Sequence, residues 1–173
     1  MAGADGTRST IRPAVLERDY PCIPSGFSCY RFLFPGKRCG GTPLEYLIDK
    51  ENPTFALMLG PDRRIAAYAC RNMELVNVVA TLPDKALHEE VHDTWIAEGS
   101  LENMRRNYDG FHPEVKLIME YIPPSSLTNL KRFADECKLW QLRDHDVPVK
   151  KWVKGKTIII GDAAHSMLPR MSS

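Results

Sequence analysis

The sequence predicts an α+β fold, with a mostly antiparallel or mixed sheet that carries its helices on one side. Several short segments are rich in β-branched and aromatic residues, which is typical of strands. Three of them, within residues 55–82, are joined by links of only a few residues, and such links favour an antiparallel meander. Two later segments, 101–108 and 113–122, have a helix cap or helical spacing of apolar residues.

The composition is that of a globular domain: 173 residues, of which 43% are hydrophobic and 26% charged. The 23 Lys and Arg nearly balance the 22 Asp and Glu, so the charge gives no case for nucleic acid or an anionic membrane as partner. No stretch approaches the roughly 18 apolar residues of a membrane-spanning helix, and residues 1–6 lack a signal-peptide core. Five cysteines without a C-x-x-C pair predict reduced thiols in a cytoplasmic protein.

The first predicted elements are a strand and a short helix. Residues 28–34 (SCYRFLF) alternate so that Arg31 shares one face with Cys29 and Leu33, and three aromatic residues share the other. Thr42-Pro43-Leu44-Glu45 is a capping box with proline at the first helical position. It predicts a short helix that ends at about Asp49.

Between residues 55 and 142 the sequence predicts several strands and helices from β-rich segments, chain breaks and helix caps. Strands are predicted at 55–59, 65–71 and 75–82, because Gly60-Pro61-Asp62 and residues 71–73 supply the breaks. Residues 85–95 have helical character, Ser100 can cap a helix over 101–108, and apolar residues after Pro113 have helical spacing up to Pro123-Pro124. Residues 138–142 (KLWQL) predict another strand.

The last predicted strand leads into the most specific motif. Residues 156–160 (KTIII) contain a continuous β-branched run, which predicts a strand buried on both faces. Gly161 allows another backbone to approach, and Asp162 can accept hydrogen bonds from a sugar or ribityl hydroxyl, with room beside Ala163 and Ala164. The alternative is a strand that ends in an ordinary turn.

Residues 152–169 (WVKGKTIIIGDAAHSMLP) closely resemble the second flavin-binding motif of the FAD-dependent aromatic hydroxylases, the class A flavoprotein monooxygenases. Residues 3–12 (GADGTRSTIR) resemble the same family's D-G-x-x-S-x-x-R motif, in the family's order and at about its separation. The resemblance is strongest to the salicylate-hydroxylase-like branch. It continues at Tyr30-Arg31, Gly60-Pro61, Tyr68, Asn77, Pro83-Asp84, Trp140, Leu142 and Asp144.

The family's N-terminal βαβ unit, with its G-x-G-x-x-G loop, and the segment after the second motif have no counterpart in these residues. The resemblance therefore implies an internal fragment of an α/β flavoprotein that does not hydroxylate an aromatic ring by itself. Residues 1–24 would belong to an FAD-binding domain, 25–146 to a substrate-binding sheet domain, and 147–173 would return one strand to the FAD-binding domain.

The resemblance also implies the residues that bind the cofactors. Asp162 would meet the ribityl hydroxyls of FAD, with Gly161 and Ala163 packed beside it and Pro169 near the isoalloxazine. Asp5, Gly6 and Arg12 would support the pyrophosphate region and the path of the nicotinamide co-substrate, NADH or NADPH. On charge alone, Arg12 would be taken for a solvated arginine.

Arg31 and Tyr68 are the catalytic residues that the resemblance implies, facing a small aromatic substrate that reacts with dioxygen. Electrophilic hydroxylation is faster on a phenolate than on a phenol. An Arg holds that anion without giving up a proton, and a Tyr hydroxyl can orient it. The alternative is an Arg that extends from a strand edge and a Tyr in ordinary sheet packing. Alternation places each residue on one face of its strand but leaves open whether the faces coincide.

His88-Glu89-Glu90-Val91-His92 matches the zinc-protease pattern H-E-x-x-H. The pattern has no H-x-x-G-x-x-H extension, because Trp95 stands where the glycine belongs, and no downstream ligand is evident. We therefore predict no metal site, although a zinc hydrolase remains a distant alternative. A nearer alternative is an inactive fragment that only associates with another chain.

Overall fold

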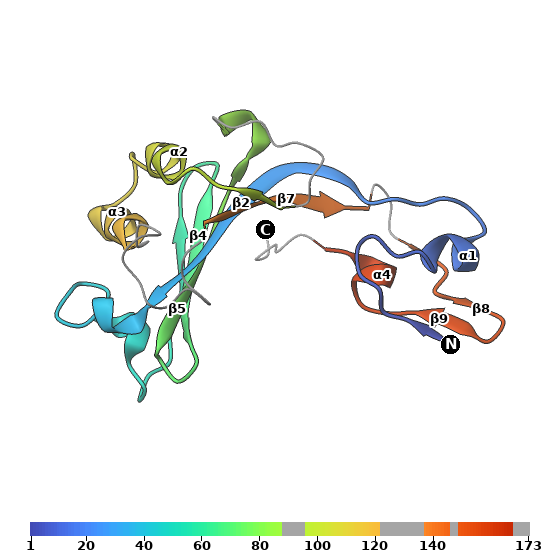
Figure 1. The fold of residues 1–173 in the computed structure, drawn as a ribbon, viewed down its shortest axis with the longest axis horizontal. Coiled ribbons are helices and arrows are strands. Elements are labelled where there is room, and N and C mark those ends of the chain that lie inside the picture. Colours follow the sequence, from blue (N-terminus) through green and yellow to red (C-terminus); the bar gives the residue numbers. More distant parts are fainter. Residues whose placement is uncertain (88–95, 122–136, 146–148, 168–173) are drawn as a thin grey trace. The chain divides into compact units, whose positions relative to one another are not determined.

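The computed structural model describes residues 1–87, 96–121, 137–145 and 149–167 (Figure 1). The chain divides into two compact units. Unit 1 comprises Met1–Phe27 and Leu142–Ser173, and unit 2 comprises Ser28–Gln141. The assignment of FAD binding and substrate binding to domains with boundaries at 24/25 and 146/147 stays a prediction, because a division by packing does not show what each part binds.

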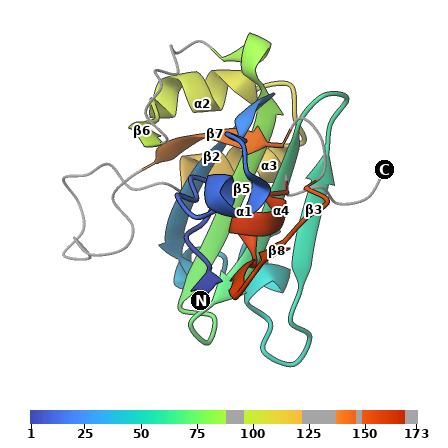
Figure 2. The same ribbon diagram turned by 90° about the vertical axis from the view of Figure 1, so that its right-hand side faces the viewer.

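A six-stranded sheet runs in the order β3-β4-β5-β2-β7-β6, with β3 at one margin and β6 at the other (Figure 2). Pairing is antiparallel for β3 with β4, β4 with β5, and β6 with β7, which confirms the predicted meander. The strands are β2 Ile23–Pro35, β3 Phe55–Leu59, β4 Arg64–Cys70, β5 Leu75–Pro83, β6 Ile96–Glu98 and β7 Lys138–Asp144.

Two helices cover one face of this sheet (Figure 1). Helix α2, Leu101–Asn107, begins after Ser100, whose Oγ accepts a hydrogen bond from the Asn103 amide at 3.2 Å, as predicted. Helix α3, Pro113–Glu120, has proline in its first turn and turns Val115, Ile118 and Met119 into the core. Ile122, predicted to continue this apolar stripe, lies outside the described residues.

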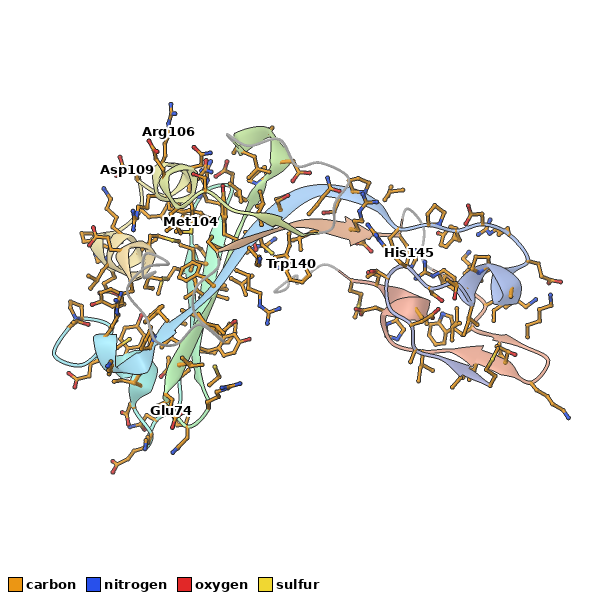
Figure 3. All side chains as sticks on the ribbon, viewed as in Figure 1. Glu74, Met104, Arg106, Asp109, Trp140 and His145 are labelled. Carbon is orange, nitrogen blue, oxygen red and sulfur yellow. The ribbon has the colours of Figure 1, made fainter. Side chains whose placement is uncertain are left out.

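The core of unit 2 lies between these helices and alternate residues of the strands. Burial of each large aliphatic or Phe side chain stabilises the fold by about 1.5–3 kcal/mol relative to an exposed position, and the alanines contribute less. The strand residues are at most 3% exposed: Tyr30, Phe32, Phe34, Ile65, Ala67, Val76, Val78, Ala80, Leu82 and Leu139. The other alternate residues form the second face, which carries Arg31, Phe55, Tyr68 and Asn77. In Figure 3, Met104 of α2 lies on the helix side of the sheet and Trp140 of β7 on the other side.

The capping-box prediction is only partly right. Residues Glu45–Ile48 form a single 3-10 helix, η2, rather than an α-helix. Thr42 Oγ1 accepts from the amide of Leu44 at 3.1 Å instead of capping the Glu45 amide. Asp49 then adopts an extended conformation and its carboxylate caps a turn at Glu51 and Asn52, which ends the helix. The other 3-10 turns are η1, Gly36–Arg38, and η3, Asp84–Ala86; beyond η3, most of the predicted 85–95 helix lies outside the described residues.

Unit 1 contains a three-stranded sheet in the order β1-β9-β8. Strand β1, Ala2–Gly3, pairs in parallel with β9, Thr157–Ile159, which pairs in antiparallel fashion with β8, Val153–Lys154. Helices α1, Arg12–Leu16, and α4, Asp162–His165, complete the unit. Its core contains Val15, Val149, Ile159, Ala163 and Ala164.

The prediction that residues 156–160 are buried on both faces is wrong for this structure. Ile159 is 1% exposed and packs with Val15 and Ala163, whereas Ile158 and Ile160 are 40% and 45% exposed. Successive side chains of a strand point to opposite faces, and α1 and α4 residues cover only the Ile159 face. The longest helix among the described residues, α3, has eight residues, and none of the described helices could cross a membrane.

Candidate functional site

In unit 1, strand β9 ends in a turn that only glycine adopts easily. Gly161 has φ 59° and ψ −145°, a region that is strained for any residue with a Cβ. Its carbonyl accepts hydrogen bonds from the amides of Ala164 and His165, both at 2.9 Å. Ala163 and Ala164 are buried, while Asp162 is exposed, and no described residue donates a hydrogen bond to its carboxylate. The turn therefore presents a carboxylate with free acceptor capacity.

Arg12 ties this turn to the N-terminal loop. Its side chain is 2% exposed, and its Nε donates to the Ala163 carbonyl at 2.8 Å. Its Nη atoms donate to the carbonyls of Asp162 (3.2 Å), Thr7 (2.9 Å), Gly6 (3.3 Å) and Tyr20 (3.2 Å). The guanidinium thus contacts both sequence motifs at once. Its predicted role beside a pyrophosphate stays a prediction, because these contacts are all to backbone carbonyls.

Asp5 organises the same N-terminal loop. Its Oδ2 accepts from the Thr10 amide at 2.7 Å, the Thr10 hydroxyl at 3.2 Å and the Ile11 amide at 3.4 Å. Hydrogen bonds from the Ser9 side chain and from Thr10 lower the pKa of the carboxyl to about 2. Gly6 follows with φ +78°, the left-handed conformation that closes the loop. The carboxylate is therefore committed to the loop, in contrast to that of Asp162.

The charge of Arg12 also acts on two neighbours in unit 1. Cys22 is 8% exposed, and burial raises the pKa of its thiol while the Arg12 charge opposes that rise. Its Sγ lies 3.7 Å from both ring nitrogens of His145. Burial, and then Arg12, lower the pKa of His145, which stacks on Tyr20 with ring centroids 5.2 Å apart. The charge of Asp144 also acts on both groups, since it raises the pKa of the Cys22 thiol and that of His145.

On the second face of the six-stranded sheet, a row of side chains crosses strands β3, β4, β5 and β2. The register places Tyr68 opposite Phe55 on one side and Asn77 on the other. The rings of Phe55 and Tyr68 stack with centroids 5.5 Å apart. Arg31 continues the row, because its Nε donates to Asn77 Oδ1 at 3.5 Å. Arg31 and Tyr68, whose relative faces the alternation left open, therefore lie on the same face.

This row combines charge, hydrogen-bonding groups and aromatic surface. Arg31 is exposed, and among the described residues only Asn77 pairs with its guanidinium, so no carboxylate neutralises it. The Tyr68 hydroxyl has no hydrogen-bond partner in the described parts of the chain. An anionic aromatic ligand could meet a cation, a hydroxyl and an aromatic surface here.

Sequence reasoning did not assign Phe55 or Asn77 to the site. The signal was present in the meander, since antiparallel strands with short links pair residues at fixed offsets across each turn. The register pairs Phe55 with Tyr68 and Tyr68 with Asn77, which puts all three side chains on one face. The burial of Asn77 could not be deduced in this way.

Two other predictions concern residues that the structure does not describe. Pro169 and the His88–His92 motif lie outside the described residues. In the ranges that are described, no three His, Cys, Asp or Glu side chains gather as metal ligands, and the zinc alternative has no support. A cavity of about 430 Å³ is lined by residues near Gly60 and Phe111, and none of Arg31, Tyr68 and Asn77 lines it.

No family model matches the sequence. Curated relatives match it over nearly its full length. It is 32% identical to a hispidin-3-hydroxylase of Neonothopanus nambi over 99% of the chain, and 30% identical to the FAD-dependent monooxygenase atnJ of an Arthrinium species over 98%. It is 30% identical to a salicylate hydroxylase of Pseudomonas putida over 100% of the chain. The chain is homologous to FAD-dependent monooxygenases.

The matched segment spans about 40% of the length of these FAD-dependent monooxygenases: 40%, 37% and 39% in the same order. A solved salicylate hydroxylase in complex with its substrate aligns with 97% of the chain and 40% of its own length, with a TM-score of 0.70 and 24% identity. That likeness shows the fold and confirms the predicted fold class, while the curated relatives confirm the predicted family resemblance.

Proposed function

We propose that this chain serves the FAD-dependent hydroxylation of an aromatic, phenolic substrate by dioxygen and NADH or NADPH. The homology to FAD-dependent monooxygenases supports the reaction class. The observation that carries the substrate class is the placement of Arg31 and Tyr68 on one sheet face, with no described carboxylate on the guanidinium. When bound, FAD accepts a hydride from the nicotinamide and activates dioxygen for transfer to the ring.

The residues of unit 1 fit the flavin. The exposed Asp162 carboxylate would accept hydrogen bonds from ribityl hydroxyls, and the Gly161–Ala163 backbone would leave room beside it. Arg12 would hold this turn against the Asp5-Gly6 loop, which would lie toward the pyrophosphate and the path of the nicotinamide. Pro169 would approach the ring system.

The residues of unit 2 fit a phenolate. Arg31 would stabilise the anion, and its high intrinsic basicity keeps it from protonating the oxygen. Tyr68 would donate a hydrogen bond from its hydroxyl and orient the ring, and Phe55 would extend the aromatic surface that Tyr68 begins. A hydrogen bond to a charged group contributes about 1.5–3 kcal/mol, which corresponds to roughly ten- to a hundredfold in phenolate affinity.

The flavin half is tested by titrating FAD and following its fluorescence anisotropy. Asp162→Ala should weaken FAD binding by about tenfold or more, since it removes a charge-assisted acceptor. Asp19→Ala is the matched control, because Asp19 is also an exposed aspartate of unit 1 and its carboxylate makes no hydrogen bond or ion pair among the described residues. Equal FAD affinity of the two variants would show that the Gly161-Asp162 turn is only structural.

The substrate half is tested with 4-nitrophenol, whose phenolate absorbs visible light. The protein should lower the apparent pKa of bound 4-nitrophenol, and Arg31→Met should abolish that shift. Arg64→Met is the control, because Arg64 lies four residues before Tyr68 on β4 and therefore points to the same face of the sheet. A shift that survives in Arg31→Met would contradict the assignment of Arg31 to the phenolate.

A further inference from the structure

Asn77 is a buried polar side chain with an unused donor. The residue is 4% exposed, and its Nδ2 is buried without a hydrogen-bond partner in the described parts of the chain. Most buried polar groups in proteins have such a partner, since burying an amide N–H unpaired costs free energy. This unpaired donor lies in the row that also contains Arg31 and Tyr68, so a ligand bound there could supply the missing acceptor.

The pairing with Arg31 fixes which end of the amide is unused. Arg31 Nε can only donate, so the atom 3.5 Å from it must be the Oδ1 acceptor of Asn77. The amino group therefore points away from that contact, and both of its N–H groups remain available. The cross-strand neighbour Tyr68 gives no acceptor, because its hydroxyl makes no hydrogen bond to Asn77.

The other cross-strand neighbours of Asn77 on this face are mostly apolar. The adjacent register pairs on the same face are Ala66 with Val79 and Cys70 with Leu75, and Phe55 lies beyond Tyr68. Of these side chains only the Cys70 thiol is an acceptor, a weak one, and it makes no hydrogen bond to the Asn77 amide. The surroundings suit the flat, apolar body of an aromatic ring with an oxygen substituent directed at the amide.

We propose that Asn77 is a specificity-determining residue of the substrate site, whose Nδ2 donates a hydrogen bond to a second oxygen substituent of the aromatic ring. This inference rests on the proposed function, in which Arg31 holds the first oxygen as a phenolate. The amide and the guanidinium are hydrogen-bonded to each other, so the two ring oxygens lie side by side. Arg31 is exposed and Tyr68 is half-buried, so the rotation of these two side chains gives a ring access to the amide.

The site therefore selects rings with two oxygen substituents over rings with one. A site that buries a hydrogen-bonding group rejects an analogue without its partner, because the group is then left unpaired. Salicylate, with a hydroxyl and a carboxylate, and phenol, with a hydroxyl alone, form a matched pair of probes. We expect the wild type to prefer salicylate, and Asn77→Leu to weaken salicylate binding by roughly ten- to a hundredfold while leaving phenol binding within about twofold.

The experiment is a titration of the ¹⁵N-labelled full chain, followed by NMR, with no flavin added because all three groups belong to unit 2. The Asn77 carboxamide signals, assigned by their absence in Asn77→Leu, should shift with salicylate and much less with phenol. Asn103→Leu is the control, since Asn103 lies on α2. Asn77→Ala removes the amide without adding volume or charge, so it provides the same test if the leucine variant does not fold.

The outcomes separate the two proposals. If Arg31→Met weakens salicylate binding but neither Asn77 variant changes the salicylate-to-phenol ratio, the role of Asn77 is overturned and the proposed function stands. If Arg31→Met leaves the affinity for both probes unchanged, or the wild type binds neither, both are overturned. Selective loss of salicylate binding in the Asn77 variants, together with a shift of the carboxamide signals, supports the inference.

Discussion

Replacing Arg12 by methionine should strongly destabilise unit 1. The buried guanidinium donates to five backbone carbonyls, two of them at short distances: Ala163 at 2.8 Å and Thr7 at 2.9 Å. A hydrogen bond that involves a charged group contributes about 1.5–3 kcal/mol, so the two short bonds alone predict a loss of about 3–6 kcal/mol. The contacts to Gly6 and Asp162 share the two protons of Nη2 with the Thr7 bond and add little, and the longer Nη1 bond to Tyr20 is left out of this figure. A loss of this size is a large fraction of the about 5–15 kcal/mol that stabilises a typical domain.

Native-state hydrogen exchange measured by mass spectrometry reports this loss in unit 1. The amides of Ile159, which donates to Trp152 O at 2.9 Å, and of Ala164 should exchange faster by two to four orders of magnitude, the equivalent of about 3–6 kcal/mol. Arg12→Lys should lose part of the stability, because an ammonium cannot reproduce the planar fork.

Arg18→Met is the matched control, since Arg18 is exposed and its main contact is with the Tyr20 ring at 4.8 Å. That contact is worth about 0.5–1 kcal/mol. If Arg12→Met costs no more than Arg18→Met, the guanidinium does not hold the two motifs together and the reasoning is refuted.

Three further predictions follow from the same structure. The pKa of Asp5 is lowered to about 2 from 3.8, so its contribution to the free energy of unfolding is complete above about pH 4 and is lost as the pH falls towards 2. In acid titrations followed by circular dichroism, Asp5→Asn should lose less stability than the wild type between about pH 4 and pH 2. Gly161→Ala should destabilise unit 1 by about 1–3 kcal/mol in urea denaturation, because a φ of 59° with a ψ of −145° is strained for any residue with a Cβ. Gly155→Ala, with φ 56° in an open turn, is the comparison, and an equal loss of stability would contradict the special role of the Gly161 turn. Burial raises the pKa of the Cys29 and Cys39 thiols to about 11, so only about one thiol in a thousand is ionised at pH 8; peptide mapping after brief iodoacetamide treatment should find the less buried Cys70 alkylated first, and early labelling of Cys29 would refute this.

Local chemistry in the sequence was sufficient for the meander strands and for helices α2 and α3, but it did not predict β1, α1, β6 or β8. The strands of the meander and the Ser100 cap depend on residues within a few positions of one another, so composition and spacing predict them. The capping box at Thr42 was misleading, because the competing Asx turn at Asp49 ended the helix after one turn. The two flavin-binding motifs could be recognised for the same reason, as each is a continuous stretch of chain.

Contacts between distant residues required the tertiary structure. Charge alone favoured a solvated Arg12 and only the motif resemblance assigned it to the cofactor site, and neither indicated that it donates to carbonyls 150 and 151 positions away. The run at 156–160 did not reveal that Ile159 is buried while Ile158 and Ile160 are not, because burial depends on which elements cover each face. The sequence by itself determined the types of the meander strands and of helices α2 and α3, the family resemblance and the candidate side chains. Only the tertiary structure decided that Arg31, Asn77 and Tyr68 share one face, since strand order and register bring together residues that the chain keeps far apart.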